Sequence, residues 1–300
     1  MGLTRRELLI AGAGCSAITA LGDPRMPNII DTHVHFYDPT RPQGVPWPPK
    51  SDALLYRTVL PPQYKAVAGS FVTGVVIVEA SAWLEDNQWI LDLAADNPLI
   101  VGFVGHLNPG ADGFGENLAR FSKNRLFRGI RVSGGDIAKG VSQQAFMDDL
   151  RRLAEAGLSM DALGNSSMVA PLITIAEKIP LLRLVIDHMP VEPPGWKPDA
   201  MRELARNPHV YSKVSTVLKR VDGKVSDDPA AYKASLDEVW DMFGADRVMY
   251  GSNWPVSENL APYPAVFNIV KQYVTARGAA DSDKYFSKNS KACYRWIERT

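Results

Sequence analysis

The first strand-like run of the chain reads Asn28-Ile29-Ile30-Asp31-Thr32-His33-Val34-His35, and the fold can be predicted from this run and its repeats. Its first part, Asn28–Thr32, has the length of a buried parallel strand, and polar side chains follow directly. Seven more apolar runs follow, each succeeded by a polar turn and an amphipathic stretch. They cover residues 74–79, 100–105, 127–132, 158–162, 183–187, 210–214 and 248–251. Eight strands that alternate with helices predict one α/β domain, a distorted (β/α)8 TIM barrel.

The stretches between these runs have the apolar spacing of amphipathic helices, most clearly over residues 83–95, 143–156 and 232–243. A doubly wound open sheet would show the same alternation, but no glycine-rich phosphate-binding turn follows the first run. The connection from Phe36 to Pro62 is long and rich in Pro, Trp and Tyr. Because the chemistry of a barrel lies in the loops after its strands, we expect this connection to form a wall or lid of the active site.

The charge balance indicates which class of partner the protein binds, and the cysteine count indicates whether a disulfide can form. The 300 residues include 33 Lys and Arg and 33 Asp and Glu, so the formal net charge is zero. This balance provides no basic field to attract nucleic acid and favours a small-molecule partner. The sequence carries no signal for an oligomeric state. If residues 1–22 are cleaved, Cys15 is lost and Cys293 has no partner for an intrachain disulfide.

Residues 1–22 resemble a twin-arginine export signal. The stretch Thr4-Arg5-Arg6-Glu7-Leu8-Leu9 precedes a weakly apolar segment that ends near Leu21, too short to span a membrane. The alternatives are an uncleaved N-terminal helix or anchor, or a lipoprotein signal that ends at Cys15. The export reading implies a bacterial periplasmic protein, without stable membrane association after processing, whose barrel domain covers residues 26–300.

Two of the five histidines, His33 and His35, stand at the end of the first run. Positions i and i+2 of a strand point to the same side, so the pair can chelate a metal such as Zn²⁺ or share a substrate oxygen. His188 ends the sixth run directly after Asp187, a typical place for a catalytic group in a barrel. Structural readings remain open: a satisfied core pair at the first run, and a histidine cap held by Asp187 at the sixth.

Other polar residues lie at strand ends. His106 closes the third run and is either a substrate contact or a polar residue at the loop mouth, whereas His209 precedes the seventh run and has a structural role. Arg131 lies in the fourth run and Asp161 ends the fifth. A buried arginine needs an anionic partner, so Arg131 holds either a substrate carboxylate or carbonyl, or Asp161. Asn253 follows the eighth run and faces the barrel mouth.

Together these motifs resemble the amidohydrolase superfamily, in its branch of sugar-acid lactonases and pyrone-dicarboxylate lactonases. The likeness runs from about Met26 to the end of the chain. The segments that carry it are Ile29–His35, Gly129–Arg131, Val185–Pro190, Arg247–Pro255 and Phe286–Ala292.

The resemblance implies a hydrolase that opens a lactone or related ester with an activated water. The family's eighth-strand motif usually reads Gly-Ser-Asp-Trp-Pro, and its Asp serves as metal ligand, general base or both. Here that position is Asn253, and an amide cannot accept a proton as a carboxylate does. We therefore expect a divalent metal to be absent or weakly held. The possible ligands are His33, His35 and His188.

The roles expected from this resemblance divide in two. His188, Asp161 and Asn253 are the candidate catalytic residues. Arg131, His106 and Trp254 are the candidate substrate-binding residues. Two alternatives stay open: a catalytically silent barrel that binds a sugar or acid ligand, which the Asn253 departure favours, and a metal-dependent decarboxylase.

Overall fold

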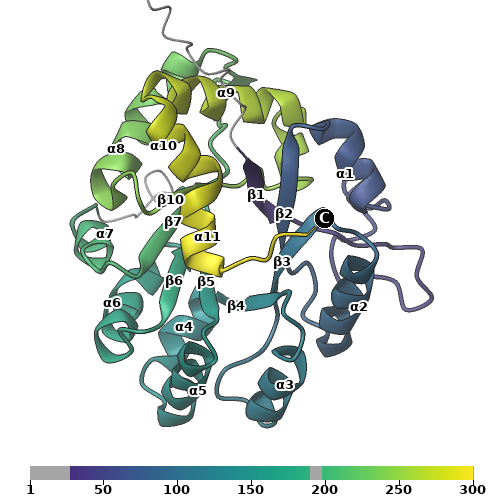
Figure 1. Ribbon diagram of the computed structural model, residues 1–300, viewed down its shortest axis with the longest axis vertical. Coiled ribbons are helices and arrows are strands. Elements are labelled where there is room, and N and C mark those ends of the chain that lie inside the picture. The colour runs from purple at the N-terminus through teal and green to yellow at the C-terminus, as the bar shows by residue number, and fades with distance from the viewer. Residues whose placement is uncertain (1–27, 190–197, 300) are drawn as a thin grey trace, which may run out of the picture.

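The computed structural model describes residues 28–189 and 198–299. Eight parallel strands form one sheet in chain order, with a helical connection after almost every strand (Figure 1). The strands are β1 (Ile29–Val34), β2 (Val72–Val78), β3 (Ile100–Gly105), β4 (Phe127–Ser133), β5 (Ser159–Leu163), β6 (Arg183–Ile186), β7 (Val210–Val214) and β10 (Val248–Tyr250). Each lies within two residues of its predicted start, which confirms the predicted barrel strands.

The sheet curls until its first and last strands meet, so the barrel is nearly closed. Thr32 Oγ1 donates to the Tyr250 carbonyl at 2.6 Å, and His35 N donates to the Trp254 carbonyl at 3.0 Å. Asp31 strengthens this seam because its carboxylate accepts a hydrogen bond from Ser252 N at 2.8 Å. The seam relies on few ladder bonds, as expected of a distorted barrel.

Helices surround the strands (Figure 1). The longer ones are α1 (Pro61–Ala68), α2 (Leu84–Ala95), α3 (Phe114–Phe121), α5 (Gln144–Glu155), α6 (Val169–Lys178), α7 (Pro198–Ala205), α8 (Lys233–Phe243) and α9 (Tyr263–Ala276). Shorter ones are α4 (Gly134–Gly140), α10 (Ala279–Asp283) and α11 (Asn289–Tyr294), with single turns at Ser166–Met168, Pro229–Tyr232, Val256–Asn259 and Lys284–Lys288. A two-stranded ribbon, β8 (Arg220–Val221) and β9 (Lys224–Val225), follows β7. The three predicted helices agree with α2, α5 and α8 to within one residue.

The chemistry of the runs explains this arrangement. All four residues of β6 are buried, since a parallel strand in a barrel is covered on both faces. On α5 the apolar side chains Phe146, Leu150 and Leu153 are spaced three or four residues apart and are all buried. Burial of one helical face against a continuous apolar strand layer supplies the core.

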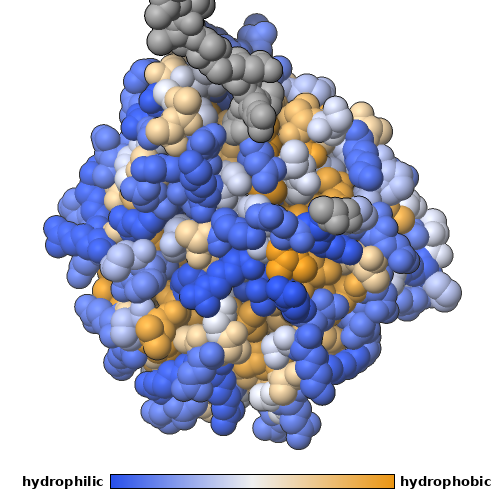
Figure 2. All heavy atoms as spheres, viewed as in Figure 1, coloured by the Kyte–Doolittle hydropathy of each residue, from blue (hydrophilic) through white to orange (hydrophobic). Residues whose placement is uncertain are grey.

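The C-terminal tail crosses one end of the barrel. Arg183 Nε at the start of β6 donates to the Cys293 carbonyl, and Ile297 N donates to Val101 O near the start of β3. Tyr294 and Trp296 belong to the same buried apolar cluster as the inner strand residues. Figure 2 shows this face, whose centre is filled by side chains, mostly hydrophilic. The tail therefore closes the N-terminal end of the strands and leaves the opposite end for ligands.

The expected export signal, residues 1–22 with Cys15, lies outside the described residues, as does the predicted domain boundary near Met26. Both stay predictions. Among the helices that are described, none is long and apolar enough to cross a membrane.

Candidate active site

A cavity of about 450 Å³ opens at the C-terminal ends of the strands. Its polar lining comes from the ends of five strands: His35, Glu79, Arg131, His188 and Asn253. The long connection after β1 contributes Pro46 and Trp47 to the wall, in agreement with its predicted position. The volume lies within the range of small-molecule sites, about 300–1,000 Å³.

Two imidazoles, those of His35 and His188, line this cavity, and the fully buried ring of His33 packs against both without lining it. The ring centroids of His33 and His35 are 5.0 Å apart, and those of His33 and His188 are 4.8 Å apart. His35 Nδ1 lies 3.0 Å from the Val78 carbonyl. A carbonyl can only accept, so Nδ1 carries the proton and Nε2 keeps its lone pair. The structure thus brings together histidines from strands that are more than 150 residues apart in sequence, as predicted.

His188 stands in a strained segment of the site. Its φ is +70°, and Thr216 and Asn253 also have left-handed backbone, with φ of +57° and +58°. Their side chains meet: His188 Nδ1 lies 3.0 Å from Thr216 Oγ1 and 2.9 Å from Ser215 Oγ, and Asn253 Nδ2 donates to Thr216 Oγ1 at 3.3 Å. Non-glycine residues with positive φ are uncommon and cluster at functional sites. The hydroxyls at Nδ1 leave His188 Nε2 as the nitrogen available to a ligand.

Burial keeps the two cavity histidines neutral. It lowers the pKa of His35 to about 3, and the nearby Arg131 guanidinium acts in the same direction. Burial also lowers the pKa of His188 to about 4, although Asp187 opposes the shift. At neutral pH both rings therefore offer an uncharged nitrogen, as a general base requires.

Below these histidines, a buried charge network fills the barrel interior. Lys213 Nζ lies 2.5 Å from Asp161 Oδ2 and 3.1 Å from Asp187 Oδ1, and all three side chains are fully buried. Tyr294 OH, from the tail, donates to Asp161 Oδ2 at 2.8 Å. Asp187 Oδ1 in turn lies 3.5 Å from His33 Nδ1. The network thus connects the plugged end of the barrel to the histidines.

The two carboxyls of this network differ. Burial raises the pKa of Asp161, and Lys213 offsets only part of that effect. Burial would raise the pKa of Asp187 as well, but Lys213 and His33 hold it well below its usual range. Asp187 is therefore the firmly ionised member, and it faces the histidines. Sequence reasoning missed Lys213, although a lysine inside the apolar run 210–214 is a signal for a buried ion pair.

Asp161 does not line the cavity. Its carboxylate is fully buried and is bonded to Lys213 and Tyr294. This placement does not support its predicted catalytic role or its predicted pairing with Arg131. Arg131 and Asp161 are neighbours in the register of β4 and β5. Each side chain nevertheless pairs with a residue of another strand.

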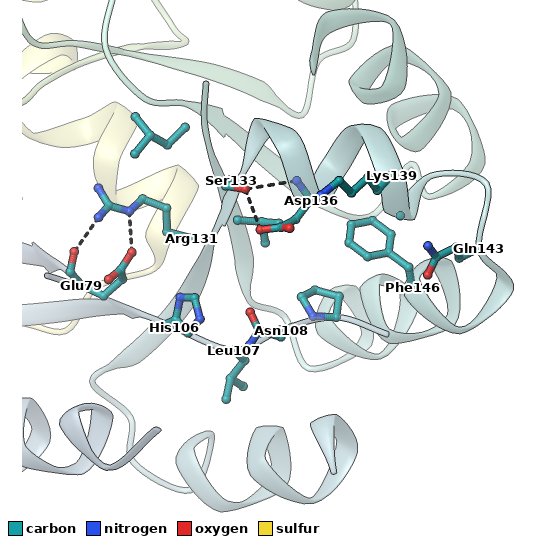
Figure 3. Close-up of a pocket in the computed structure, with 14 residues that line it drawn as sticks. Glu79, His106, Leu107, Asn108, Arg131, Ser133, Asp136, Lys139, Gln143 and Phe146 are labelled. Atoms are coloured by element: carbon teal, nitrogen blue, oxygen red, sulfur yellow. Dashed lines mark hydrogen bonds and ion pairs between the residues drawn. The ribbon is translucent and has the colours of Figure 1, made fainter. Parts of the chain in front are cut away.

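Arg131 instead pairs with Glu79, a residue that sequence reasoning also missed. Arg131 Nε lies 2.8 Å from Glu79 Oε1, and Nη2 donates to the Glu79 carbonyl at 2.7 Å (Figure 3). Arg131 Nη1 also faces Asp187 Oδ2 at 3.9 Å. The guanidinium is thereby fixed at the cavity edge, where its remaining N–H groups can face a ligand.

The other predicted residues are spread more widely. Trp254 is fully buried, and its indole N–H donates to Glu258 Oε1 at 2.7 Å. It packs against Phe36 and Tyr64, so its position does not support the predicted substrate contact. His106 lines a neighbouring cavity rather than this one. Asn253, by contrast, does line the cavity, as expected.

A protein metal site needs at least three donors that converge on one point. In residues 28–189 and 198–299, no group of three or more His, Cys, Asp or Glu is arranged to hold an ion. His33 has two buried ring nitrogens without a hydrogen bond in this part of the chain, yet the neighbouring imidazoles do not complete a coordination group around it. The residues as placed therefore do not form a metal site.

Comparisons with known proteins agree with this geometry. A family model described as "Amidohydrolase" matches residues 30–296. An L-fucono-1,5-lactonase from Burkholderia ambifaria is 29% identical over 238 residues, which cover 76% of this chain and 80% of that protein. Another L-fucono-1,5-lactonase, from Burkholderia multivorans, is 28% identical over 88% of this chain and 95% of its own. A crystal structure of an amidohydrolase from Burkholderia multivorans with bound zinc superposes with a TM-score of 0.80 at 25% identity, covering 90% of this chain and all of that one.

Proposed function

The chain belongs to the amidohydrolase family, and from this premise we propose that it is a hydrolase that opens a small sugar-acid lactone. The observation that carries the proposal is that the imidazoles of His35 and His188 line the cavity beside the Arg131 guanidinium, which Glu79 holds in place. The lactonase names of the similar proteins support ester hydrolysis more than the decarboxylase alternative. The mixed polar lining of the cavity suits a ligand rich in hydroxyl groups.

In the proposed reaction, His188 Nε2 is the general base. It takes a proton from a water molecule, and the water oxygen attacks the lactone carbonyl carbon. Ser215 and Thr216 at Nδ1 hold the ring in place and fix which nitrogen faces the water. The imidazolium that results is stabilised by Asp187, directly before it in the chain.

The carbonyl oxygen becomes negative in the tetrahedral intermediate. Free N–H groups of Arg131 stabilise that charge, because the guanidinium is already oriented by Glu79. The ring C–O bond then breaks, and the leaving alkoxide takes the proton from His188. One lactone and one water give one hydroxy acid. His35 Nε2 accepts a hydrogen bond from a substrate hydroxyl, and the base is His188 rather than Asn253.

The test is a panel of aldono-1,5-lactones assayed by acid release, with and without a chelator. We expect hydrolysis above the spontaneous rate that survives chelation. Loss of activity with the chelator would place a metal in the mechanism. A protein that binds aldonates but opens no lactone would be the silent binder that the Asn253 departure favours.

We also propose export to the periplasm, which rests on the twin-arginine-like stretch Thr4–Leu9 alone. Cell fractionation of the full chain in a bacterium should find the barrel in the periplasm. The double variant Arg5→Lys, Arg6→Lys should retain it in the cytoplasm. Equal distribution of the two forms would contradict export by this route.

A further inference from the structure

A second cavity lies beside the first at the C-terminal ends of the strands. It measures about 440 Å³ and is bounded by the segment after β3, by α4 and by the start of α5 (Figure 3). Its polar side chains include His106, Asn108, Lys139 and Gln143. None of these has a role in the reaction proposed above.

The two cavities share a wall. Glu79, Arg131 and Leu163 line both of them. Glu79 and Arg131 are bonded to each other, so the wall between the cavities is a fixed ion pair rather than a mobile side chain. Because both cavities contact the same Arg131 and Glu79, a ligand whose reactive group lies against Arg131 in the first cavity can reach across this pair into the second.

The charges of the second cavity are balanced. Arg131 and Lys139 supply two cations, and Glu79 and Asp136 supply two carboxylates. Glu79 is engaged by Arg131, and Asp136 Oδ2 accepts a hydrogen bond from Ser133 Oγ at 2.6 Å. The formal charges of these four groups cancel, so the cavity has no net charge that would select an anionic or a cationic ligand.

The uncharged polar groups of the second cavity are therefore the ones that can select a ligand. The side-chain amides of Asn108 and Gln143 have no hydrogen-bond partner in the part of the chain that the structure describes. An amide offers both donors and an acceptor, and a hydroxyl likewise donates and accepts. Amides and charged pairs around an open cavity are therefore complementary to a neutral ligand with several hydroxyl groups.

We propose that the second cavity binds a neutral, hydroxyl-rich arm of the substrate, so that the preferred substrate is the lactone of a disaccharide or longer sugar acid. This inference rests on the proposed lactonase function. The lactone ring occupies the first cavity, and the second sugar residue lies against Asn108 and Gln143. Arg131, at the shared wall, contacts the ring end of the ligand.

The experiment compares glucono-1,5-lactone with cellobiono- and maltobiono-1,5-lactone, which add a second glucose through a β or an α linkage. We expect kcat/KM for the better disaccharide lactone to exceed that for glucono-1,5-lactone by about tenfold or more, since each factor of ten needs only one or two good polar contacts. The variants Gln143→Ala and Asn108→Ala should each reduce this ratio by about threefold or more.

Gln144→Ala is the matched control, because Gln144 is the next residue and donates to Asp148 on the exposed side of α5. It should leave the ratio as in the wild type. A ratio near one or below for both disaccharides would overturn the inference while leaving the lactonase intact.

Calorimetry with the corresponding aldonates separates this result from failure of the proposed function. If no lactone is opened, the lactonase proposal fails. The cavity assignment then stands only if a disaccharide aldonate binds about tenfold more tightly than gluconate and loses that advantage in Gln143→Ala. Equal affinities would overturn it.

Discussion

The two ends of the barrel are built from opposite kinds of chemistry. At the N-terminal end, the tail inserts Tyr294 and Trp296 into an apolar cluster, and its backbone is hydrogen-bonded to β3 and β6. At the C-terminal end, two imidazoles, a guanidinium and an amide line an open cavity, and the buried ring of His33 lies behind them. The left-handed non-glycine residues His188, Thr216 and Asn253 lie at this end.

The difference shows how one fold separates stability from function. The closed end contributes buried apolar surface and satisfied hydrogen bonds. Their stabilising free energy offsets the cost of the strained backbone and of the desolvated imidazoles at the open end. The two ends are joined through the interior, where Tyr294, Asp161, Lys213 and Asp187 form one chain of contacts to His33. Substitutions at the open end should therefore affect mainly catalysis, and substitutions at the closed end mainly stability. Substitutions of Lys213 should affect both.

The largest effect is expected at the open end. His188→Asn removes the proposed base but keeps a residue type that tolerates left-handed backbone, so kcat/KM should fall by about 10²- to 10⁴-fold with little loss of stability. Steady-state kinetics with an aldono-1,5-lactone measure the fall. His209→Gln is the matched control at the N-terminal side of β7 and should change kcat/KM less than about twofold. A similar loss in both variants would contradict the separation of the two ends.

The link between the ends is tested by Lys213→Met. Removing the cation leaves Asp161 with only the Tyr294 hydroxyl and Asp187 with only the more distant His33 and Arg131, which should lower the free energy of unfolding by about 3–5 kcal/mol. Urea unfolding measures this loss. Adding Asp161→Asn to the variant should restore part of the stability. A loss below about 1 kcal/mol would mean that the ion pairs do not hold the interior together.

The pH dependence of catalysis tests whether the open end contains a desolvated base. Burial lowers the pKa of His188 to about 4, so the base stays neutral, and active, until the pH falls to that value. The acid limb of kcat/KM should therefore lie near pH 4, and at pH 5 activity should be about thirtyfold higher than for a histidine that titrates at about 6.5. A pH–rate profile between 3.5 and 8 measures it. An acid limb near pH 6.5 would exclude His188, as placed here, from the role of base.

A moderate effect is expected at the closed end. Tyr294→Phe removes the hydrogen bond to Asp161 but keeps the ring in its apolar cluster, so the free energy of unfolding should fall by about 1–2 kcal/mol. Thermal or urea unfolding measures the loss. kcat/KM should stay within about twofold of the wild type. A larger catalytic loss with unchanged stability would place the tail in the chemistry.

The smallest effect concerns the metal. We expect clearly less than one equivalent of zinc in purified protein, because Asn253 replaces the family's carboxylate with a neutral amide. Asn253→Asp should raise the metal content, measured by elemental analysis, the hydrolytic rate, or both. If the native protein instead retains a full equivalent through dialysis against a chelator, the weak-site hypothesis is wrong. If Asn253→Asp lowers the rate, Asn253 orients the substrate.

The order and extent of the strands could be predicted from the sequence alone. Apolar runs such as Leu184–Ile186 and the helical spacing around Leu150 are local patterns, and each reflects burial of its own segment. The same locality placed His33, His35, His188 and Asn253 at strand ends. A barrel brings such ends to one rim, so the common cavity of His35, His188 and Asn253 could be predicted from position alone, whereas the burial of His33 behind them could not.

The pairing of the polar groups, by contrast, could be seen only in the folded barrel. Arg131 engages Glu79, 52 residues earlier, and Asp161 engages Lys213, 52 residues later. Trp254, adjacent to a cavity residue in sequence, turns into the core and bonds Glu258. Periodicity reports only whether a side chain is buried. Partners are set by the stagger of neighbouring strands, by side-chain length and by the tail that crosses the barrel, and these relations are distant in the chain.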